Sequence, residues 1–141
     1  MCRLVGNQAQ KDGGGALVAG SATLIAVGGL IASNFVGGDG GGLAVVESAS
    51  FSAEGAEPLE LRNNTARQNG GAALFSSEGG VTLSSQMVSI KFNSATRGGG
   101  IFFLSKLELM GSAATQIQSN VASGMGGGLF GYGTLNKVQP V

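Results

Sequence analysis

The amino-acid sequence repeats one pattern five times, and this repeat constrains the fold more than any other feature. In each copy an apolar residue stands three positions before an asparagine, and a run of glycines then precedes a short apolar segment. The repeating asparagines, Asn7, Asn34, Asn64, Asn93 and Asn120, are separated by 27, 30, 29 and 27 residues. A period of this length is typical of a solenoid, in which each repeat buries its apolar face against its neighbours.

The residue types within the repeat decide between a helical and a β solenoid. Glycine accounts for 27 of the 141 residues and occurs inside every copy. Each glycine in a helix interior costs about 1 kcal/mol, so helical repeats are excluded. We expect an all-β chain that forms a single domain over residues 1–141, a parallel β-helix of about five coils of 27–30 residues. We also expect a fragment, because Met1–Gln10 has neither the basic nor the apolar region of a signal peptide. We expect it to lack end caps, because neither end of the sequence looks like a polar cap.

Each repeat is predicted to hold three short strands. In two successive repeats these are Ala72–Ser76, Val81–Ser84 and Met87–Phe92, then Ile101–Leu104, Leu107–Met110 and Thr115–Gln118. Apolar and polar residues alternate in Val81–Leu83, as on a strand with one buried face. The glycines would permit positive φ at a corner and allow neighbouring coils to approach closely. The asparagines would stack at one corner into a ladder, each side chain bonding the turns above and below.

The stretch Ala16–Val36 has a second interpretation. It is uncharged and mostly apolar, and it is long enough to cross a bilayer as a helix. It also follows the common repeat, with strands at Ala16–Val18, Thr23–Ala26 and Leu30–Ile31. We favour the buried coil and expect no membrane span.

Composition excludes several classes of function. Eight Lys and Arg balance eight Asp and Glu, so no basic field favours nucleic acid. The chain has no histidine, which removes the Ser-His-Asp triad and the usual zinc ligands. Cys2 is the single cysteine, so no internal disulfide framework is possible. We expect no catalytic residue, no cofactor and no metal.

Two places stand apart from this uniform pattern. Asp12 and Asp39 each follow their asparagine by five residues, and Asn69 takes that position in the next copy. If stacked, they could hold calcium or place two carboxylates about 5 Å apart. Asp and Asn before glycine are also ordinary turn residues, which is the interpretation we adopt. Pro58 lies in the longest repeat, where we expect a bulged loop, and Ser50–Pro58 is the candidate binding loop.

The pattern apolar-x-x-Asn-x-Ala followed by Gly-Gly-apolar resembles the repeat of the chlamydial polymorphic outer membrane proteins, which pairs Phe-x-x-Asn with Gly-Gly-Ala-Ile/Leu/Val. The stretches Asn64–Ala72 and Asn93–Ile101 look closest to it, and the resemblance extends over the whole chain in five copies. This sequence departs from the family at the phenylalanine, which is replaced in every copy by Leu4, Ile31, Leu61, Ile90 or Ile117.

The resemblance implies the right-handed β-helical passenger of an autotransporter, displayed on the cell surface or outer membrane, or extracellular, and used in adhesion. The implied partner is a host or neighbouring cell-surface protein or a glycan, and the implied role is structural or binding without catalysis. The alternative is a fragment of a carbohydrate-active β-helix enzyme, similar to polysaccharide lyases or glycoside hydrolases. That alternative requires Asp12, Asp39 and an Arg or Lys to converge on one exposed strand face beside a groove.

Overall fold

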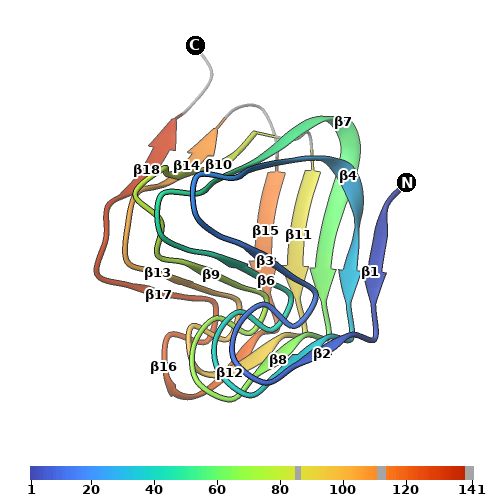
Figure 1. Ribbon diagram of the computed structural model, residues 1–141, viewed down its shortest axis with the longest axis vertical. Helices are drawn as coiled ribbons and strands as arrows, with labels where there is room; N and C mark the ends of the chain where they lie inside the picture. Colours follow the sequence, from blue (N-terminus) through green and yellow to red (C-terminus); the bar gives the residue numbers. More distant parts are fainter. Residues whose placement is uncertain (85–86, 111–113, 139–141) are drawn as a thin grey trace.

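The computed structural model describes residues 1–84, 87–110 and 114–138, and every regular element in these ranges is a β-strand. The strands of successive coils pair in parallel, so that the chain winds into a solenoid (Figure 1). The predicted all-β parallel solenoid of about five coils is therefore confirmed. Three sheets run along it.

The widest sheet, sheet I, has eight strands. They are β1 (Arg3–Val5), β4 (Thr23–Ala32), β7 (Ser50–Arg62), β10 (Val81–Leu83), β11 (Met87–Lys91), β14 (Leu107–Met110), β15 (Ala114–Gln118) and β18 (Leu135–Val138). The long strand β7 pairs with both β10 and β11, through Phe51 opposite Val81 and Leu59 opposite Val88. One long strand in an early coil thus corresponds to two short strands in a later one.

The other two sheets have five strands each. Sheet II follows the asparagines and consists of β2 (Gln8–Ala9), β5 (Phe35–Val36), β8 (Thr65–Ala66), β12 (Ser94–Arg97) and β16 (Val121–Met125). Sheet III follows the glycines and consists of β3 (Ala16–Val18), β6 (Leu43–Val45), β9 (Ala73–Phe75), β13 (Ile101–Phe103) and β17 (Leu129–Gly131).

The predicted strands exist, and they occupy two of the three sheets. The first strand of each repeat lies in sheet III, and the second and third both lie in sheet I. Sheet II was not predicted. Its strands β2, β5 and β8 have two residues each, which is too short for alternation to be visible in the sequence.

The transmembrane interpretation of Ala16–Val36 is wrong, because this stretch forms β3, β4 and β5. Among the described residues there is no helix with the length and hydrophobicity that a membrane crossing requires. The glycines at Gly28 and Gly29 lie inside β4, where both have positive φ.

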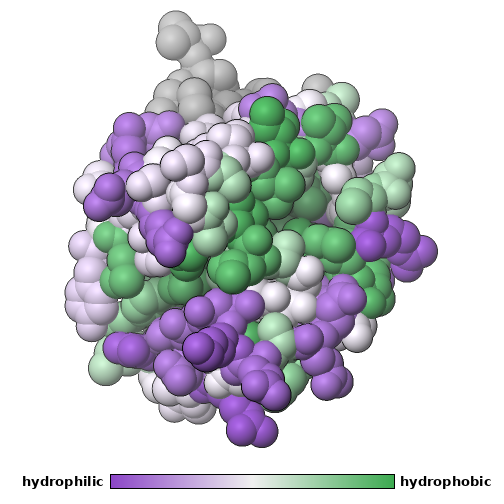
Figure 2. All heavy atoms as spheres, viewed as in Figure 1, coloured by the Kyte–Doolittle hydropathy of each residue, from purple (hydrophilic) through white to green (hydrophobic). Residues whose placement is uncertain are grey.

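The core lies between the inward faces of sheets I and III. Leu43 and Val45 of β6, Phe75 of β9 and Ile101 of β13 pack against sheet I residues such as Leu83 in one cluster. Each fully buried side chain of this size contributes about 1.5–3 kcal/mol relative to an exposed one. The first coil faces the viewer in Figure 2, where hydrophobic side chains gather over β3 and β4. That coil thus leaves open an apolar side that inner coils bury against a neighbour.

Candidate functional site

The five asparagines form a continuous ladder, as predicted. The Oδ1 of Asn64 accepts hydrogen bonds from the backbone nitrogen and the Nδ2 of Asn34, at 3.1 and 3.0 Å. The Nδ2 of Asn64 donates to the Oδ1 of Asn93 at 3.0 Å and to the carbonyl oxygen of Ile31 at 2.9 Å. Asn7 donates to Asn34, and Asn93 to Asn120, in the same way. Asn34, Asn64 and Asn93 are buried, so their amides serve the stacking of coils.

The ladder also explains why the apolar residue stands three positions before each asparagine. The carbonyl oxygen of that residue accepts a hydrogen bond from the asparagine Nδ2 of the next coil, in the four cases of Leu4, Ile31, Leu61 and Ile90. The side chains of these residues pack in the core. The apolar-x-x-Asn spacing is therefore structural, because one residue supplies both a core side chain and a ladder acceptor.

The residue just before each asparagine has a left-handed backbone in all five coils. These residues are Gly6, Ser33, Asn63, Phe92 and Ser119, with φ between 54° and 72°. Sequence reasoning missed this feature, because the side chains at the five positions have nothing in common. The five residues share only their position directly before a ladder asparagine. Two of them, Gly6 and Asn63, are of types that favour a left-handed backbone.

The glycine runs perform both of the tasks expected of them. The first glycine of each run has positive φ, as in Gly40 at 71° and Gly70 at 66°. The second glycine allows close stacking, since a Cβ on Gly41 would overlap the carbonyl oxygen of Gly71 in the next coil. A side chain at the second position is therefore excluded by the backbone of the neighbour.

A second ladder joins the residues that precede the glycine runs. The N–H of Asp39 donates to Asp12 Oδ1 at 3.3 Å, and the N–H and Nδ2 of Asn69 donate to Asp39 Oδ1 at 2.9 and 2.8 Å. Arg97 Nε continues the ladder to Asn69 Oδ1 at 2.8 Å. The predicted stacking of Asp12, Asp39 and Asn69 is confirmed, and Arg97 was missed. Counting back from Gly98, rather than forward from Asn93, finds it.

The side chains of this second ladder mainly form hydrogen bonds between successive coils. Asp39 Oδ1 already accepts two hydrogen bonds from Asn69, and the next member along the ladder is a cation rather than a carboxylate. The part of the chain that the structure describes contains no group of three or more Asp, Glu, His or Cys residues arranged to hold a metal ion. The geometry therefore gives Asp12 and Asp39 hydrogen-bonding partners without a metal cage around them.

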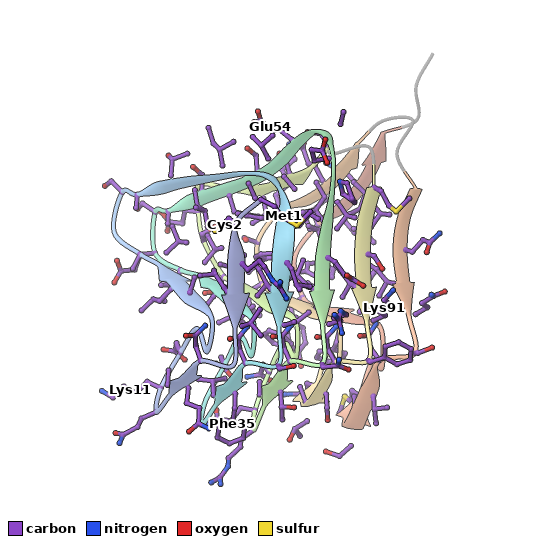
Figure 3. The ribbon with its side chains drawn as sticks, turned by 90° about the vertical axis from the view of Figure 1, so that its right-hand side faces the viewer. Met1, Cys2, Lys11, Phe35, Glu54 and Lys91 are labelled. Atoms are coloured by element: carbon purple, nitrogen blue, oxygen red, sulfur yellow. The ribbon has the colours of Figure 1, made fainter. Side chains whose placement is uncertain are left out.

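The candidate binding loop is shorter than the sequence indicated. Phe51 and Ala53 are strand residues with side chains in the core, so the first half of Ser50–Pro58 is not a loop. The pairing of β4 with β7 jumps from Glu54 to Leu59, and the four residues Gly55–Pro58 oppose Gly28 alone. This segment, which we call the β7 bulge, is exposed and begins beside Glu54 at the upper edge of sheet I (Figure 3). The predicted bulge around Pro58 is correct.

Charged side chains gather on the outer face of sheet I. Glu60 of β7 forms ion pairs with Lys91 of β11 at 2.9 Å and with Arg62 at 3.4 Å (Figure 3). These groups are partly exposed, and each such pair contributes about 0–1 kcal/mol. Further along the same sheet, a hydrogen bond from Lys106 lowers the pKa of Glu108. We interpret these charges as the solvated face of the sheet.

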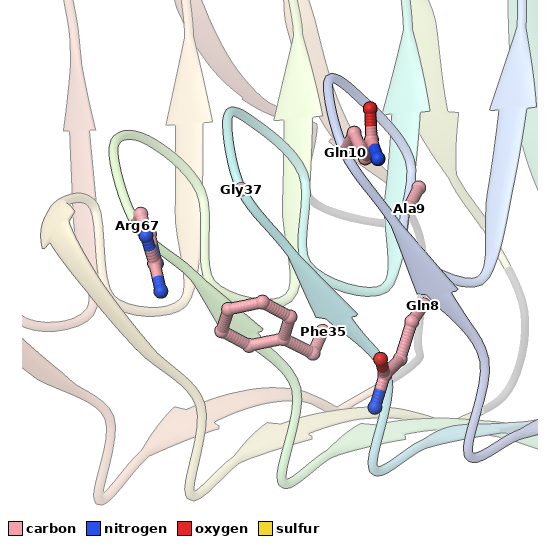
Figure 4. A pocket seen from close by; sticks show the side chains of 6 residues that line it. All are labelled: Gln8, Ala9, Gln10, Phe35, Gly37 and Arg67. Carbon is pink, nitrogen blue, oxygen red and sulfur yellow. The ribbon is translucent and has the colours of Figure 1, made fainter.

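Sheet II carries a hollow on its outer face that sequence analysis did not find. Its lining includes the ring of Phe35 and the guanidinium of Arg67, which lies 5.6 Å from the ring centroid (Figure 4). No sequence pattern signals this hollow, because these residues come from different coils and meet only through the parallel pairing of β5 and β8.

These features define the chain as a parallel β-helix held together by stacked asparagines and glycines. Comparisons with protein-family models, with curated proteins and with solved structures find no match to it. We therefore infer its function from the arrangement of the chain's own residues and from the motif resemblance.

Proposed function

We propose that this chain is a non-catalytic β-helical repeat protein, an adhesin-like passenger at a cell surface or outside the cell. The observation that carries the proposal is that the polar side chains repeated in every coil bond to one another along the axis, as Asn34 does to Asn64 and Asn64 to Asn93. Side chains used in this way build a rod. The outer faces of its strands are then free to vary and to contact partners.

The motif resemblance supports the placement of this rod outside the cell. The spacing of the asparagines and glycines is similar to the repeat of right-handed autotransporter passengers, and the ladder tolerates isoleucine or leucine in place of the family's phenylalanine. Only the carbonyl oxygen of that residue enters the ladder, as at Ile31 and Leu61. Any core side chain of suitable size fulfils the same requirement. The proposed partners are cell-surface proteins or glycans.

Antibody labelling tests the placement. An antibody raised against the purified chain should label intact cells of the source organism, or detect the protein in the medium, and brief protease treatment of intact cells should remove the label. Labelling that requires permeabilised cells would contradict the proposal. An antibody against a cytoplasmic protein serves as the control for cell integrity.

One observation favours the enzyme alternative. Asp12, Asp39 and Arg97 belong to the same ladder, so two carboxylates and a cation do lie along one line of the solenoid. Incubating the chain with acidic and neutral polysaccharides, and measuring new reducing ends and unsaturated sugars, decides between the two. We expect no new chain ends. Cleavage that disappears in Asp39→Asn would instead establish a carbohydrate-active enzyme.

A further inference from the structure

The hollow on sheet II is lined by residues other than the members of the two ladders. It has a volume of about 370 Å³ and is lined by Gln8, Ala9, Gln10, Phe35, Gly37 and Arg67. It spans the first three coils, because Gln8 of β2 lies opposite Phe35 of β5, and Phe35 lies opposite Thr65 of β8. Figure 4 shows the Phe35 ring between Gln8 and Arg67, with Gln10 across the opening.

Gly37 contributes backbone to the lining of this hollow. Backbone hydrogen bonds from Gly37 to Ala9, and from Arg67 to Val36, place Gly37 between Gln10 and Arg67 of the adjoining coils. A Cβ on Gly37 would collide with the carbonyl oxygen of Gln10. Glycine at this position therefore lets the two coils approach closely, and its backbone forms part of the lining between the side chains of Gln10 and Arg67.

The walls of the hollow combine three kinds of chemistry. Phe35 is half-buried, which fixes its ring and leaves part of it accessible. Arg67 is exposed, and the ion pairs in the described part of the chain do not involve it. Its guanidinium presents a planar set of donors that matches a carboxylate. The exposed amides of Gln8 and Gln10 each offer donors and an acceptor, which suits hydroxyl groups.

We propose that this hollow binds an acidic sugar, one hexuronic acid unit of a polysaccharide. The carboxylate of the sugar pairs with Arg67, the apolar C–H face of its ring lies on Phe35, and its hydroxyls bond to Gln8 and Gln10. The hollow is near the small end of ligand sites, so it suits one unit of a longer chain. This inference rests on the proposed binding role and gives it a site and a ligand class.

A neutral sugar or an acidic peptide would use only part of these walls. A neutral sugar has no group that needs the Arg67 guanidinium, whose donors would then bond only to water. An acidic peptide would pair with Arg67, but its extended backbone has no flat apolar face to place on the Phe35 ring. A sugar acid uses the cation, the ring and the amides together.

Titration of the whole 141-residue chain tests the site. The probe is a tetramer of galacturonic acid, and a tetramer of galactose is its neutral match. Calorimetry at low salt should show the acidic tetramer binding about tenfold or more tightly than the neutral one. Arg67→Gln should weaken binding about tenfold or more, because it removes a charge-assisted pair. Phe35→Leu keeps the apolar bulk but removes the flat ring, and should weaken binding about threefold or more.

Arg62→Gln is the matched control, since it removes the same charge from the outer face of sheet I. It should change the affinity by less than about twofold. Equal losses in Arg67→Gln and Arg62→Gln would overturn the site in favour of general charge attraction. Equal binding of the two tetramers, or equally tight binding of a tetraglutamate peptide, would also overturn it. The antibody experiment is independent of these titrations, so a wrong sugar site and a wrong location give different results.

Discussion

At the scale of single residues, the ladder asparagines carry more of the stability than their number indicates. Asn64→Ala would leave the N–H of Asn34, the carbonyl of Ile31 and the Oδ1 of Asn93 short of partners. Each buried unsatisfied group costs about 1–3 kcal/mol, and we expect the free energy of unfolding to fall by about 3 kcal/mol or more. Chemical denaturation followed by circular dichroism measures this.

The matched control for that substitution is Asn7→Ala in the first coil. Asn7 is exposed and its side chain donates to Asn34, so its loss should cost less than about 1 kcal/mol. Similar losses at the two positions would show that burial in the ladder does not set the cost.

Phe92 offers the opposite case, a residue that the fold strains. It has φ of 59° and a side chain that is 57% exposed, and a left-handed backbone costs about 1–2 kcal/mol for most residues. Asn63 occupies the same position one coil earlier, and asparagine tolerates this conformation. Phe92→Asn should therefore stabilise the protein by about 0.5–1 kcal/mol, seen as a raised melting temperature.

Phe92→Ala distinguishes two possible causes of the stabilisation by Phe92→Asn, namely relief of the backbone strain and removal of the exposed ring. It also removes the exposed ring but keeps the unfavourable backbone, so it should give little of the stabilisation. If alanine stabilises as much as asparagine, the exposed phenylalanine itself is the source.

Sequence reasoning identified every ladder asparagine through its spacing. It could not find this strain, because the corner imposes the positive φ at residues such as Ser33 and Phe92 and their side chains have nothing in common.

At the scale of elements, coil stacking depends on the second glycine of each run. A Cβ on Gly71 would overlap the carbonyl oxygen of Gly99, although φ at Gly71 is not positive. Gly71→Ala should therefore destabilise the protein by about 3 kcal/mol or more, through the clash alone, as overpacking against rigid backbone does. Denaturation curves recorded beside those of the wild-type chain give the value.

Gly6→Ala provides the comparison for backbone conformation without a clash. Gly6 has φ of 72°, and a Cβ added to it would meet no atom within 4 Å, so the expected loss is about 1 kcal/mol. A loss at Gly6 as large as that at Gly71 would mean that conformation, and not the approach of neighbouring coils, dominates the need for glycine.

The β7 bulge is the element most free to change. Four residues, Gly55–Pro58, connect Glu54 to Leu59, whereas Gly28 alone connects the corresponding residues of β4. Replacing Gly55–Pro58 with a single glycine should keep the fold and shift the melting temperature by only a few degrees, because the bulge is exposed. If the chain binds a surface through this bulge, the shortened variant loses binding to that surface while keeping its circular dichroism spectrum.

A collapse of the fold in the shortened variant would contradict the view of the bulge as an insertion.

The sequence located this insertion through the longer repeat and Pro58, but placed its start too early. Ser50 and Ser52 alternate with buried Phe51 and Ala53, and small polar residues there looked like loop. Sheet II escaped prediction for a related reason, since strands as short as Thr65–Ala66 are defined by their neighbours in other coils rather than by their own pattern.

At the scale of the whole molecule, each coil contacts only the coils before and after it. Its stability is therefore approximately a sum of coil terms and neighbour terms. The repeat period alone was enough to predict that the coils stack on one another. A common period places equivalent residues of successive coils side by side, even where the lengths of the strands between them differ. The hollow on sheet II could not be predicted in this way, since it depends on what differs between coils, a glycine in one and an arginine in the next.

Hydrogen exchange should reveal this one-dimensional organisation. The backbone amides of Asn34 and Asn64 donate to the Oδ1 atoms of the next asparagine and lie in buried coils, whereas Asn7 is exposed in the first coil. Because local opening requires fewer contacts to break at an end, we expect protection to be highest at Asn64 and to fall toward both ends. Exchange measured by NMR at several denaturant concentrations gives the opening free energy of each amide. Equal opening free energies at Asn7 and Asn64 would mean that the five coils open together as one cooperative unit, with the ladder acting as a single element.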